Sequence, residues 1–136
     1  FTYYSVSNVK DLRNYDVQQA PFIFQDYVNQ KSDVRVTIIG DEVYSHEILS
    51  GDRNIEGDWR AIPKEQLGFR KFELPVSIKN KCFQLLEELG LRYGAIDLLK
   101  VENHYYFLEI NPTGEWGWLN SEECRIDKTI ADTLLY

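Results

Sequence analysis

Two acidic residues and one asparagine within residues 94–111 have the residue types and the spacing of a cation site. If the turn in this segment is the three residues 102–104, Asp97 falls directly opposite Glu109, where like charges repel. Asn111, two residues beyond Glu109, then points to the same face of the sheet. Oxygen ligands of this kind suit Mg²⁺, which shares its coordination sphere with substrate phosphates. A two-residue turn would put the acids on opposite faces, and a solvent-facing strand edge with two unrelated acids is the alternative interpretation. On the other face, the expected core residues are Ile96, Leu98, Leu108 and Ile110.

A second group of polar side chains is predicted on a hairpin over residues 33–49. Apolar residues alternate with Arg35 and its polar neighbours, so the polar side chains point to one face of the strand. The pair Gly40-Asp41 fits a two-residue turn with glycine first. This register places Arg35 opposite His46, which is more simply a cross-strand neighbour than a catalytic base.

The rest of the chain supplies the elements that must position these residues. An apolar stripe over residues 78–89 predicts a helix that begins near Pro75 and ends at Gly90. Residues 50–74 are polar and predict a long mobile loop, and Asp127 is expected to cap a final helix. Further expected elements are strands over residues 1–6, 21–28, 93–100 and 105–110, a helical turn over 9–12, and an irregular loop over 111–121. This order predicts an α+β fold, with helices packed on a mostly antiparallel sheet.

Length and composition limit the possible functions. The chain has 136 residues and is 43% hydrophobic, which is enough apolar material for the core of one domain. Its 22 Asp and Glu against 15 Lys and Arg give a net charge of −7, so a nucleic-acid partner is not expected. No apolar run approaches the roughly 18 residues of a membrane span.

Cys82 and Cys124 have no metal-ligand spacing, and Cys82 is expected in the core. Because the chain begins with Phe1 and contains no Met, we expect a fragment of a longer product.

Six short motifs, in order along the chain, resemble the second half of an ATP-grasp ligase. They are residues 24–28 (FQDYV), 33–36 (DVRV), 40–43 (GDEV), 58–60 (DWR), 94–97 (GAID) and 108–112 (LEINP). The first five also occur, more loosely, in ligases that add glutamate to a ribosomal protein. The extension over residues 111–118 (NPTGEWGW) resembles the branch that makes side-chain lactones and lactams in ribosomally made peptides, the microviridin or graspetide type. Its residues Trp116 and Trp118 could be core residues or part of a peptide-acceptor wall.

The resemblance implies that residues 1–136 form a single domain, the C-terminal lobe of an ATP-grasp enzyme from the hinge onward. The N-terminal domain and the first nucleotide-binding lobe are expected to be absent, because no Gly-rich phosphate loop is found. Lys10, the one lysine ahead of the hinge, does not match the family's nucleotide-binding lysine. The lobe alone is expected to be inactive.

The resemblance also implies roles for the matching residues. The implied nucleotide-binding residues are Gln25, Asp26, Tyr27, Val28 and Asp33. The implied catalytic residues, which would face the phosphates, are Arg35 and Arg60. The implied Mg²⁺ ligands are Asp97, Glu109 and Asn111. Taken singly, these residues have plainer interpretations as strand-end polar residues, exposed ion pairs or loop charges.

The implied function is an ATP- and Mg²⁺-dependent ligase that activates a carboxylate as an acyl phosphate and joins it to an amine or hydroxyl group. The expected partner is a precursor peptide or a peptide-like carboxylate, with no nucleic acid and no membrane. The intact protein is expected in the cytoplasm, and a homodimer is possible. The alternatives are an amino-acid or small-molecule ligase of the ribosomal-protein glutamate-ligase type, and a non-catalytic peptide-recognition module.

Overall fold

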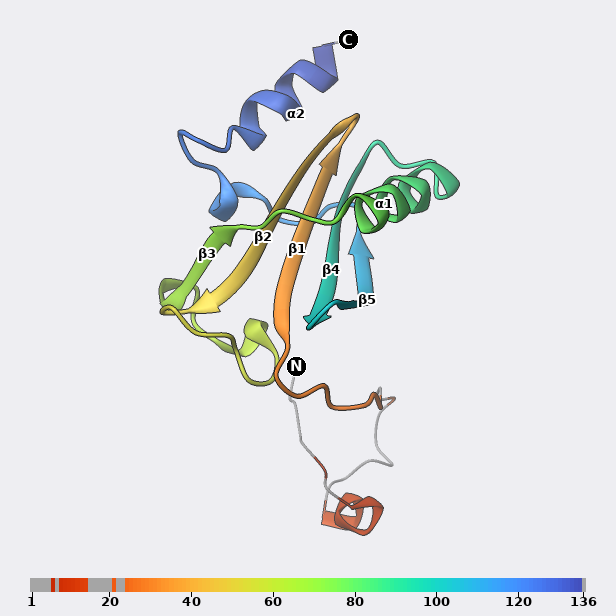
Figure 1. The fold of residues 1–136 in the computed structure, drawn as a ribbon, viewed down its shortest axis with the longest axis vertical. Helices are drawn as coiled ribbons and strands as arrows, with labels where there is room; N and C mark the ends of the chain where they lie inside the picture. Colours follow the sequence, from red (N-terminus) through yellow and green to blue (C-terminus); the bar gives the residue numbers. More distant parts are fainter. Residues whose placement is uncertain (1–5, 7, 15–20, 22–23, 136) are drawn as a thin grey trace.

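The computed structural model describes residues 6, 8–14, 21 and 24–135. Within them, five strands form one antiparallel sheet in the order β3-β2-β1-β4-β5 (Figure 1). The strands are β1 (Ser32–Ile39), β2 (Glu42–Ser50), β3 (Leu67–Lys71), β4 (Tyr93–Val101) and β5 (His104–Asn111). The helices are α1 (Val76–Glu88), α2 (Ile126–Leu135) and the short 3₁₀ helices η1 (Val9–Asn14), η2 (Trp59–Ala61), η3 (Lys64–Gln66) and η4 (Gly117–Leu119). This arrangement confirms the predicted α+β fold. None of the helices in the described residues is long and apolar enough to cross a membrane.

Helix α1 covers one face of the sheet and forms the main core with it (Figure 1). Its predicted apolar stripe is present, with Cys82 and Leu86 buried against Val36 and Ile96 of the central strands. Burial raises the pKa of the Cys82 thiol to about 11, so this residue stays neutral and acts as a small core side chain. Gly90, at a φ of +66°, lies directly after the helix, as predicted.

The opposite face of the sheet, which we call the site face, carries polar side chains along its middle. Side chains alternate along a strand, so Arg35 and Asp97 point away from the core that contains their neighbours Val36 and Ile96. Helix α2 and η4 cover one end of this face. There Ile39, Leu119 and Ile126 are buried together in a second, smaller core. The middle of the site face is therefore left to charged residues.

The β4–β5 hairpin has a shorter turn than the sequence predicted. Its turn contains two residues, Glu102 and Asn103, instead of the three expected. Glu102 occupies the first turn position with a φ of 52°, a conformation that favours glycine. Val101 consequently pairs with His104, one residue away from the predicted register.

An extra residue in β5 restores the predicted pairing before the strand reaches the acidic residues. Leu98 pairs with Phe107, but the next pair is Asp97 with Glu109, so Leu108 has no partner of its own. This β-bulge cancels the shift caused by the shorter turn. The expectation that a two-residue turn would separate the two acids is therefore wrong. Leu108 is also not the predicted core residue, because it is 37% exposed.

Other predicted elements differ from the structure in detail. The strand predicted over residues 21–28 does not form at the described positions 21 and 24–28, and residues 22–23 lie outside the described residues. The strand predicted over residues 1–6 also lies outside the described residues, except for residue 6. Part of the predicted loop over residues 50–74 is ordered, because β3 pairs with the edge of β2. This strand is short and contains a glycine, so it carries little periodic signal. Helix α2 begins at Ile126, which places Asp127 in its first turn and not at the cap.

From the two-residue turn of the β4–β5 hairpin we expect opposite effects of two glycine substitutions. Glu102→Gly should raise the free energy of unfolding by up to about 1 kcal/mol, because glycine has no Cβ to strain at positive φ. His104→Gly should lower it, because His104 belongs to the strand. Denaturant unfolding of both variants measures these changes. The reverse result would mean a three-residue turn, in which His104 takes the left-handed position.

Candidate active site

One polar side chain from each of four adjacent strands forms a row across the site face. His46 on β2 pairs with Arg35 on β1, as the sequence predicted. Arg35 pairs in turn with Asp97 on β4, which pairs with Glu109 on β5. We call these four residues the polar row. Its inner members are almost fully buried, whereas the side chain of Glu109 at the sheet edge is 55% exposed.

Asp97 lies at the centre of the polar row, in contact with two arginines. Its Oδ1 atom lies 2.8 Å from Nε of Arg35, and its Oδ2 atom accepts a hydrogen bond from Nη2 of Arg60. Burial raises the pKa of Asp97 to about 6, the two arginines oppose this shift, and Glu109 adds to it. A buried carboxylate is therefore retained here because cations compensate it.

Arg60 bridges the two acids of the polar row from the segment that precedes β3. Its Nη2 atom contacts Asp97 and lies 2.5 Å from Oε1 of Glu109. Asp58 fixes this segment as the N-cap of η2, since its Oδ1 atom accepts from the backbone N–H of Arg60 at 2.9 Å and from Nη1 at 3.3 Å. Burial opposes the charged form of Arg60, but Asp97, Asp58 and Glu109 together raise its pKa. The guanidinium thus sits where the sequence predicted a cation.

Two tryptophans pack against the arginines: Trp59 contacts both, and Trp118 contacts Arg35. The guanidinium carbon of Arg35 lies 5.4 Å from the ring centre of Trp59 and 5.9 Å from that of Trp118. The guanidinium carbon of Arg60 lies 4.7 Å from Trp59. The two indoles also contact each other, at 5.7 Å between ring centres. Cation–π contacts of this kind hold the planar groups in fixed orientations. Sequence reasoning left the role of Trp118 open and gave Trp59 no role of its own.

The loop after β5 packs tightly against the polar row. Asn111 Oδ1 accepts hydrogen bonds from the Thr113 backbone N–H at 2.9 Å and from its hydroxyl at 3.2 Å. Gly114 is buried, and a Cβ at this position would lie 2.5 Å from Cβ of Ala95 and 3.3 Å from Nη1 of Arg35. Glycine is therefore the residue that allows the loop to reach the site.

The three predicted Mg²⁺ ligands lie on the same face of the sheet. Asp97 and Glu109 pair, and Asn111 lies two residues further along the same face, opposite Ala95. Oδ1 of Asp97 is buried and makes no hydrogen bond within the described residues. The described residues contain no group of three or more His, Cys, Asp or Glu that could hold a metal. A cation here would therefore need the Asn111 amide oxygen and substrate oxygens, as is usual for Mg²⁺.

A buried lysine beside the polar row was missed by sequence reasoning. Lys31 Nζ donates to Asp33 Oδ2, and both side chains are at most 7% exposed. Burial raises the pKa of Asp33, and Lys31 opposes the shift. Buried lysines are rare unless they are paired. The signal in the sequence is that Lys31, just before β1, alternates with Asp33 and Arg35 on β1, which common surface strands also show.

The structure does not join the predicted hinge to the polar row. Gln25, Asp26 and Tyr27 are exposed, Val28 is half-buried, and the segment leads directly into β1. Among the described residues, none of these four makes a hydrogen bond or ion pair with the polar row. Their nucleotide-binding role stays a prediction.

A family model described as the RimK-like ATP-grasp domain matches residues 6–134 of the chain. The chain belongs to this family. The match confirms the resemblance carried by the six motifs, and the sheet with its two helices has the ATP-grasp fold.

Relatives and solved structures give the same result. The tetrahydromethanopterin:alpha-L-glutamate ligase of Methanocaldococcus jannaschii is 26% identical over 133 residues, which cover 95% of this chain and 43% of that protein. A RiPP-associated ATP-grasp ligase from Chryseobacterium gregarium, in complex with ADP and a leader and core peptide, has a TM-score of 0.70 at 37% identity. That alignment covers 82% of this chain and 35% of the other. The macrocyclase MdnC from Microcystis aeruginosa, bound with precursor peptide MdnA, has a TM-score of 0.60 at 30% identity, over 76% of this chain and 33% of the other. The chain thus spans less than half the length of each. The RiPP-associated neighbour agrees with the branch that residues 111–118 predicted.

The close approach of Gly114 predicts a specific loss of stability. Gly114→Ala should lower the free energy of unfolding by about 1–3 kcal/mol, because the new methyl group overlaps Ala95. Gly117→Ala is the matched control, since nothing lies within 4 Å of a Cβ at Gly117. Urea unfolding of both variants measures the difference. Equal stabilities would contradict the tight packing of this loop.

Proposed function

We propose that the intact protein is an ATP-dependent ligase that joins a carboxylate of a ribosomal peptide to an amine or hydroxyl group. The polar row with its bridging Arg60 carries this proposal, because it gathers acids and arginines at one place on a rigid sheet. The solved neighbours support it, since one is described with ADP and both with peptides.

The proposed reaction has two steps. A carboxylate oxygen of the substrate attacks the γ-phosphorus of ATP, which releases ADP and leaves an acyl phosphate. The amine or hydroxyl then attacks the acyl carbon and expels phosphate, so an amide or ester forms as the nucleophile loses its proton. Phosphoryl transfer depends on positioning and charge neutralisation more than on covalent help from the protein.

Several of these polar residues have a part in this scheme. Bound Mg²⁺ would neutralise phosphate charge, and the residues that would hold it are Asp97, Glu109 and Asn111. Arg35 stabilises the phosphoryl group as it is transferred. The guanidinium of Arg35 is held in position by the ion pair of its Nε with Asp97 and by its contacts with the indole rings of Trp59 and Trp118. Its terminal nitrogens make no hydrogen bond within the described residues and stay available as donors. The hinge residues 25–28 and Asp33 bind the nucleotide in this proposal.

A second candidate function is a ligase that adds glutamate to a small molecule or protein. The match to the glutamate ligase of M. jannaschii favours this candidate, because it covers 95% of this chain. The same arginines and acids would serve both reactions, because both would activate a carboxylate with ATP.

One experiment separates the two candidates. The intact protein is incubated with ATP, Mg²⁺ and the small peptide encoded beside its gene, with and without glutamate, and the peptide is analysed by mass spectrometry. Loss of one water per linkage supports side-chain ligation within the peptide. Addition of glutamate supports the second candidate. An unchanged peptide together with no ADP formation contradicts the first candidate.

Removing one acid of the proposed metal site should stop ligation without unfolding the protein. We expect Asp97→Asn and Glu109→Gln in the intact enzyme to lower turnover by about 100-fold or more. The control is Glu115→Gln, an exposed acid that pairs with Lys64. Turnover is followed by mass spectrometry and folding by circular dichroism. Wild-type turnover of either folded variant at limiting Mg²⁺ would contradict the assignment.

Arg60 and a divalent cation would neutralise the same two carboxylates, so they should compete. We therefore expect Arg60→Gln to bind Mn²⁺, used as a spectroscopic substitute for Mg²⁺, several-fold more tightly in the absence of nucleotide. The control is Arg70→Gln, which removes an arginine paired with Glu47 outside the polar row. Paramagnetic resonance titration of free Mn²⁺ measures the affinity. Equal or weaker binding by Arg60→Gln would show that no cation enters between these acids.

A further inference from the structure

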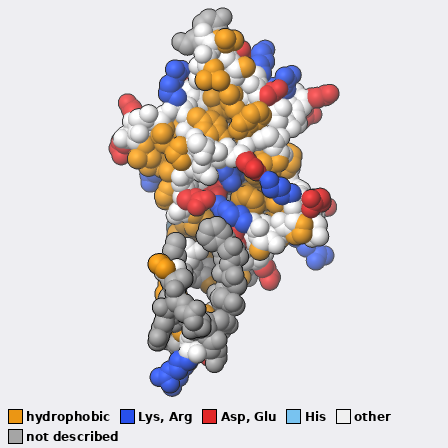
Figure 2. Space-filling view, turned by 180° about the vertical axis from the view of Figure 1, so that it is seen from behind, with side chains coloured by type: hydrophobic (Ala, Val, Ile, Leu, Met, Phe, Trp, Pro, Cys, Tyr) orange, Lys and Arg blue, Asp and Glu red, His pale blue; other side chains and the backbone are white. Residues whose placement is uncertain are grey.

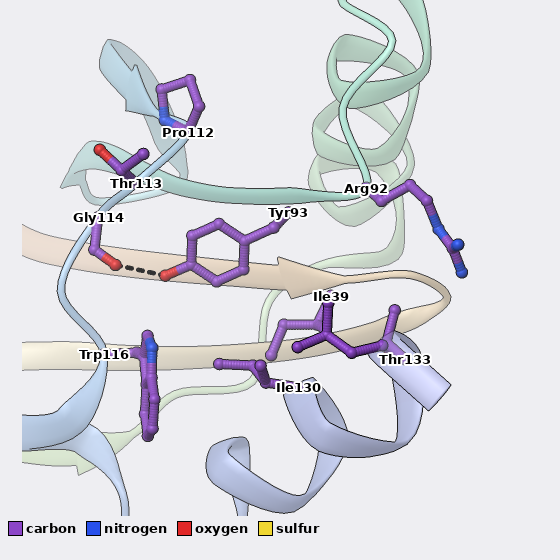
Figure 3. Close-up of a pocket in the computed structure, with 10 residues that line it drawn as sticks. Ile39, Arg92, Tyr93, Pro112, Thr113, Gly114, Trp116, Ile130 and Thr133 are labelled. Atoms are coloured by element: carbon purple, nitrogen blue, oxygen red, sulfur yellow. Dashed lines mark hydrogen bonds between the residues drawn. The ribbon is translucent and has the colours of Figure 1, made fainter. Parts of the chain in front are cut away.

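A cavity of about 330 Å³ lies next to the polar row and is separate from it (Figure 3). It opens between the end of the site face, the loop after β5 and α2. Its walls include Tyr93, Pro112, Gly114, Trp116 and Ile130. No member of the polar row lines it. The volume is at the lower end of the roughly 300–1,000 Å³ typical of ligand pockets, so one large apolar side chain fits within it.

The loop after β5 is a wall shared by the cavity and the polar row. Pro112 and Gly114 line the cavity, and a Cβ added at Gly114 would lie 3.3 Å from Nη1 of Arg35. The hydroxyl of Tyr93, which also lines the cavity, donates a hydrogen bond to the carbonyl of Gly114 and fixes this wall (Figure 3). Gly114 therefore lines the cavity and also lies next to Arg35.

Among the described residues, Arg92 is the only charged residue that lines the cavity. Figure 3 shows Arg92 at one end of the cavity, with Trp116 toward the other end. Within the described residues its side chain makes no ion pair, and its backbone carbonyl accepts from the Gly40 N–H at 2.8 Å. In a chain of net charge −7, an unpaired arginine beside an acid-free apolar cavity favours a carboxylate ligand.

Exposed apolar side chains also lie on the surface of α2, among them Leu134 of the cavity lining and Leu135 outside it. In Figure 2, apolar side chains extend down from the end that carries α2 and give way to mixed acidic and basic side chains near the middle. Leu134, on the cavity lining, is 81% exposed, so the cavity is open to a chain that continues beyond it.

We propose that this cavity binds one large apolar side chain of the peptide substrate and that Arg92 pairs with an acidic residue next to it. The proposal rests on the proposed function, since it takes the ligand to be a peptide. Anchoring the peptide here fixes its register, and the register decides which of its carboxylates reaches Arg35 across the loop. The cavity is therefore a specificity site for the choice of the modified residue.

The test uses short blocked peptides with a central Phe-Asp, Ala-Asp or Phe-Asn pair as probes, because the natural peptide is not needed. The intact protein is labelled with fluorotryptophan, and the fluorine signal of Trp116 is assigned by its loss in Trp116→Phe. We expect the Phe-Asp peptide to shift this signal and to bind about five- to tenfold more tightly than either of the other peptides. Arg92→Gln should remove the preference for Asp over Asn. The control is Arg53→Gln, which should retain the preference for Asp over Asn. Arg53 is exposed and lies just after the end of β2, whereas Arg92 contacts the turn before β2.

Each outcome bears on the cavity separately from the ligase reaction. A Trp116 shift with the expected preferences supports the cavity site, whether or not the mass-spectrometric assay detects ligation. The proposal is overturned if Trp116 does not respond, or if the three peptides bind equally. It is also overturned if Arg92→Gln keeps the preference for Asp. If the intact enzyme ligates its peptide but the fluorine signal of Trp116 does not shift, the proposed function stands and the cavity is not part of the peptide-binding site.

Discussion

The burial of Asp97 on a central strand is the constraint on which the rest of the site depends. A carboxylate that is 3% exposed has lost most of its hydration, and it can stay in the fold only if nearby cations compensate it. Arg35 supplies one cation from the adjacent strand, and Arg60 supplies another from a segment 37 residues away in the sequence. The indoles and the Asp58 cap then hold these arginines in place. Much of the site can be understood as support for one buried negative charge.

The two faces of the sheet divide stability from chemistry. The face under α1 holds the main apolar core, which contains no member of the polar row. The site face holds that row, and α2 and η4 cover one end of it. Side-chain alternation along each strand makes this division possible, because neighbouring residues such as Val36 and Arg35 serve opposite faces. Substitutions in the polar row can therefore change the chemistry while most of the apolar packing is kept.

Sequence reasoning predicted the local patterns well and the long-range contacts poorly. Helix α1, the turn at Gly40 and the pairing of Arg35 with His46 follow from periodicity and turn chemistry, which are local. The pairing of Asp97 with Glu109 was also predicted, but from the wrong turn length. A single bulge residue leaves the residue types unchanged, so no pattern could reveal it. The bridge from Arg60 to the two acids depends on how a loop folds back on the sheet, which neither propensity nor spacing encodes.

The bulge at Leu108 also affects how the hairpin can vary during evolution. It divides the β4–β5 ladder into a tip, paired in one register, and a base near the site, paired in another. A residue gained or lost at the tip can be absorbed by forming or removing the bulge, so Glu109 keeps its place opposite Asp97. Homologous chains with hairpin tips of different length can therefore share the same acid pair. Sequence alignments of this hairpin should accordingly be anchored at the base and allowed gaps at the tip.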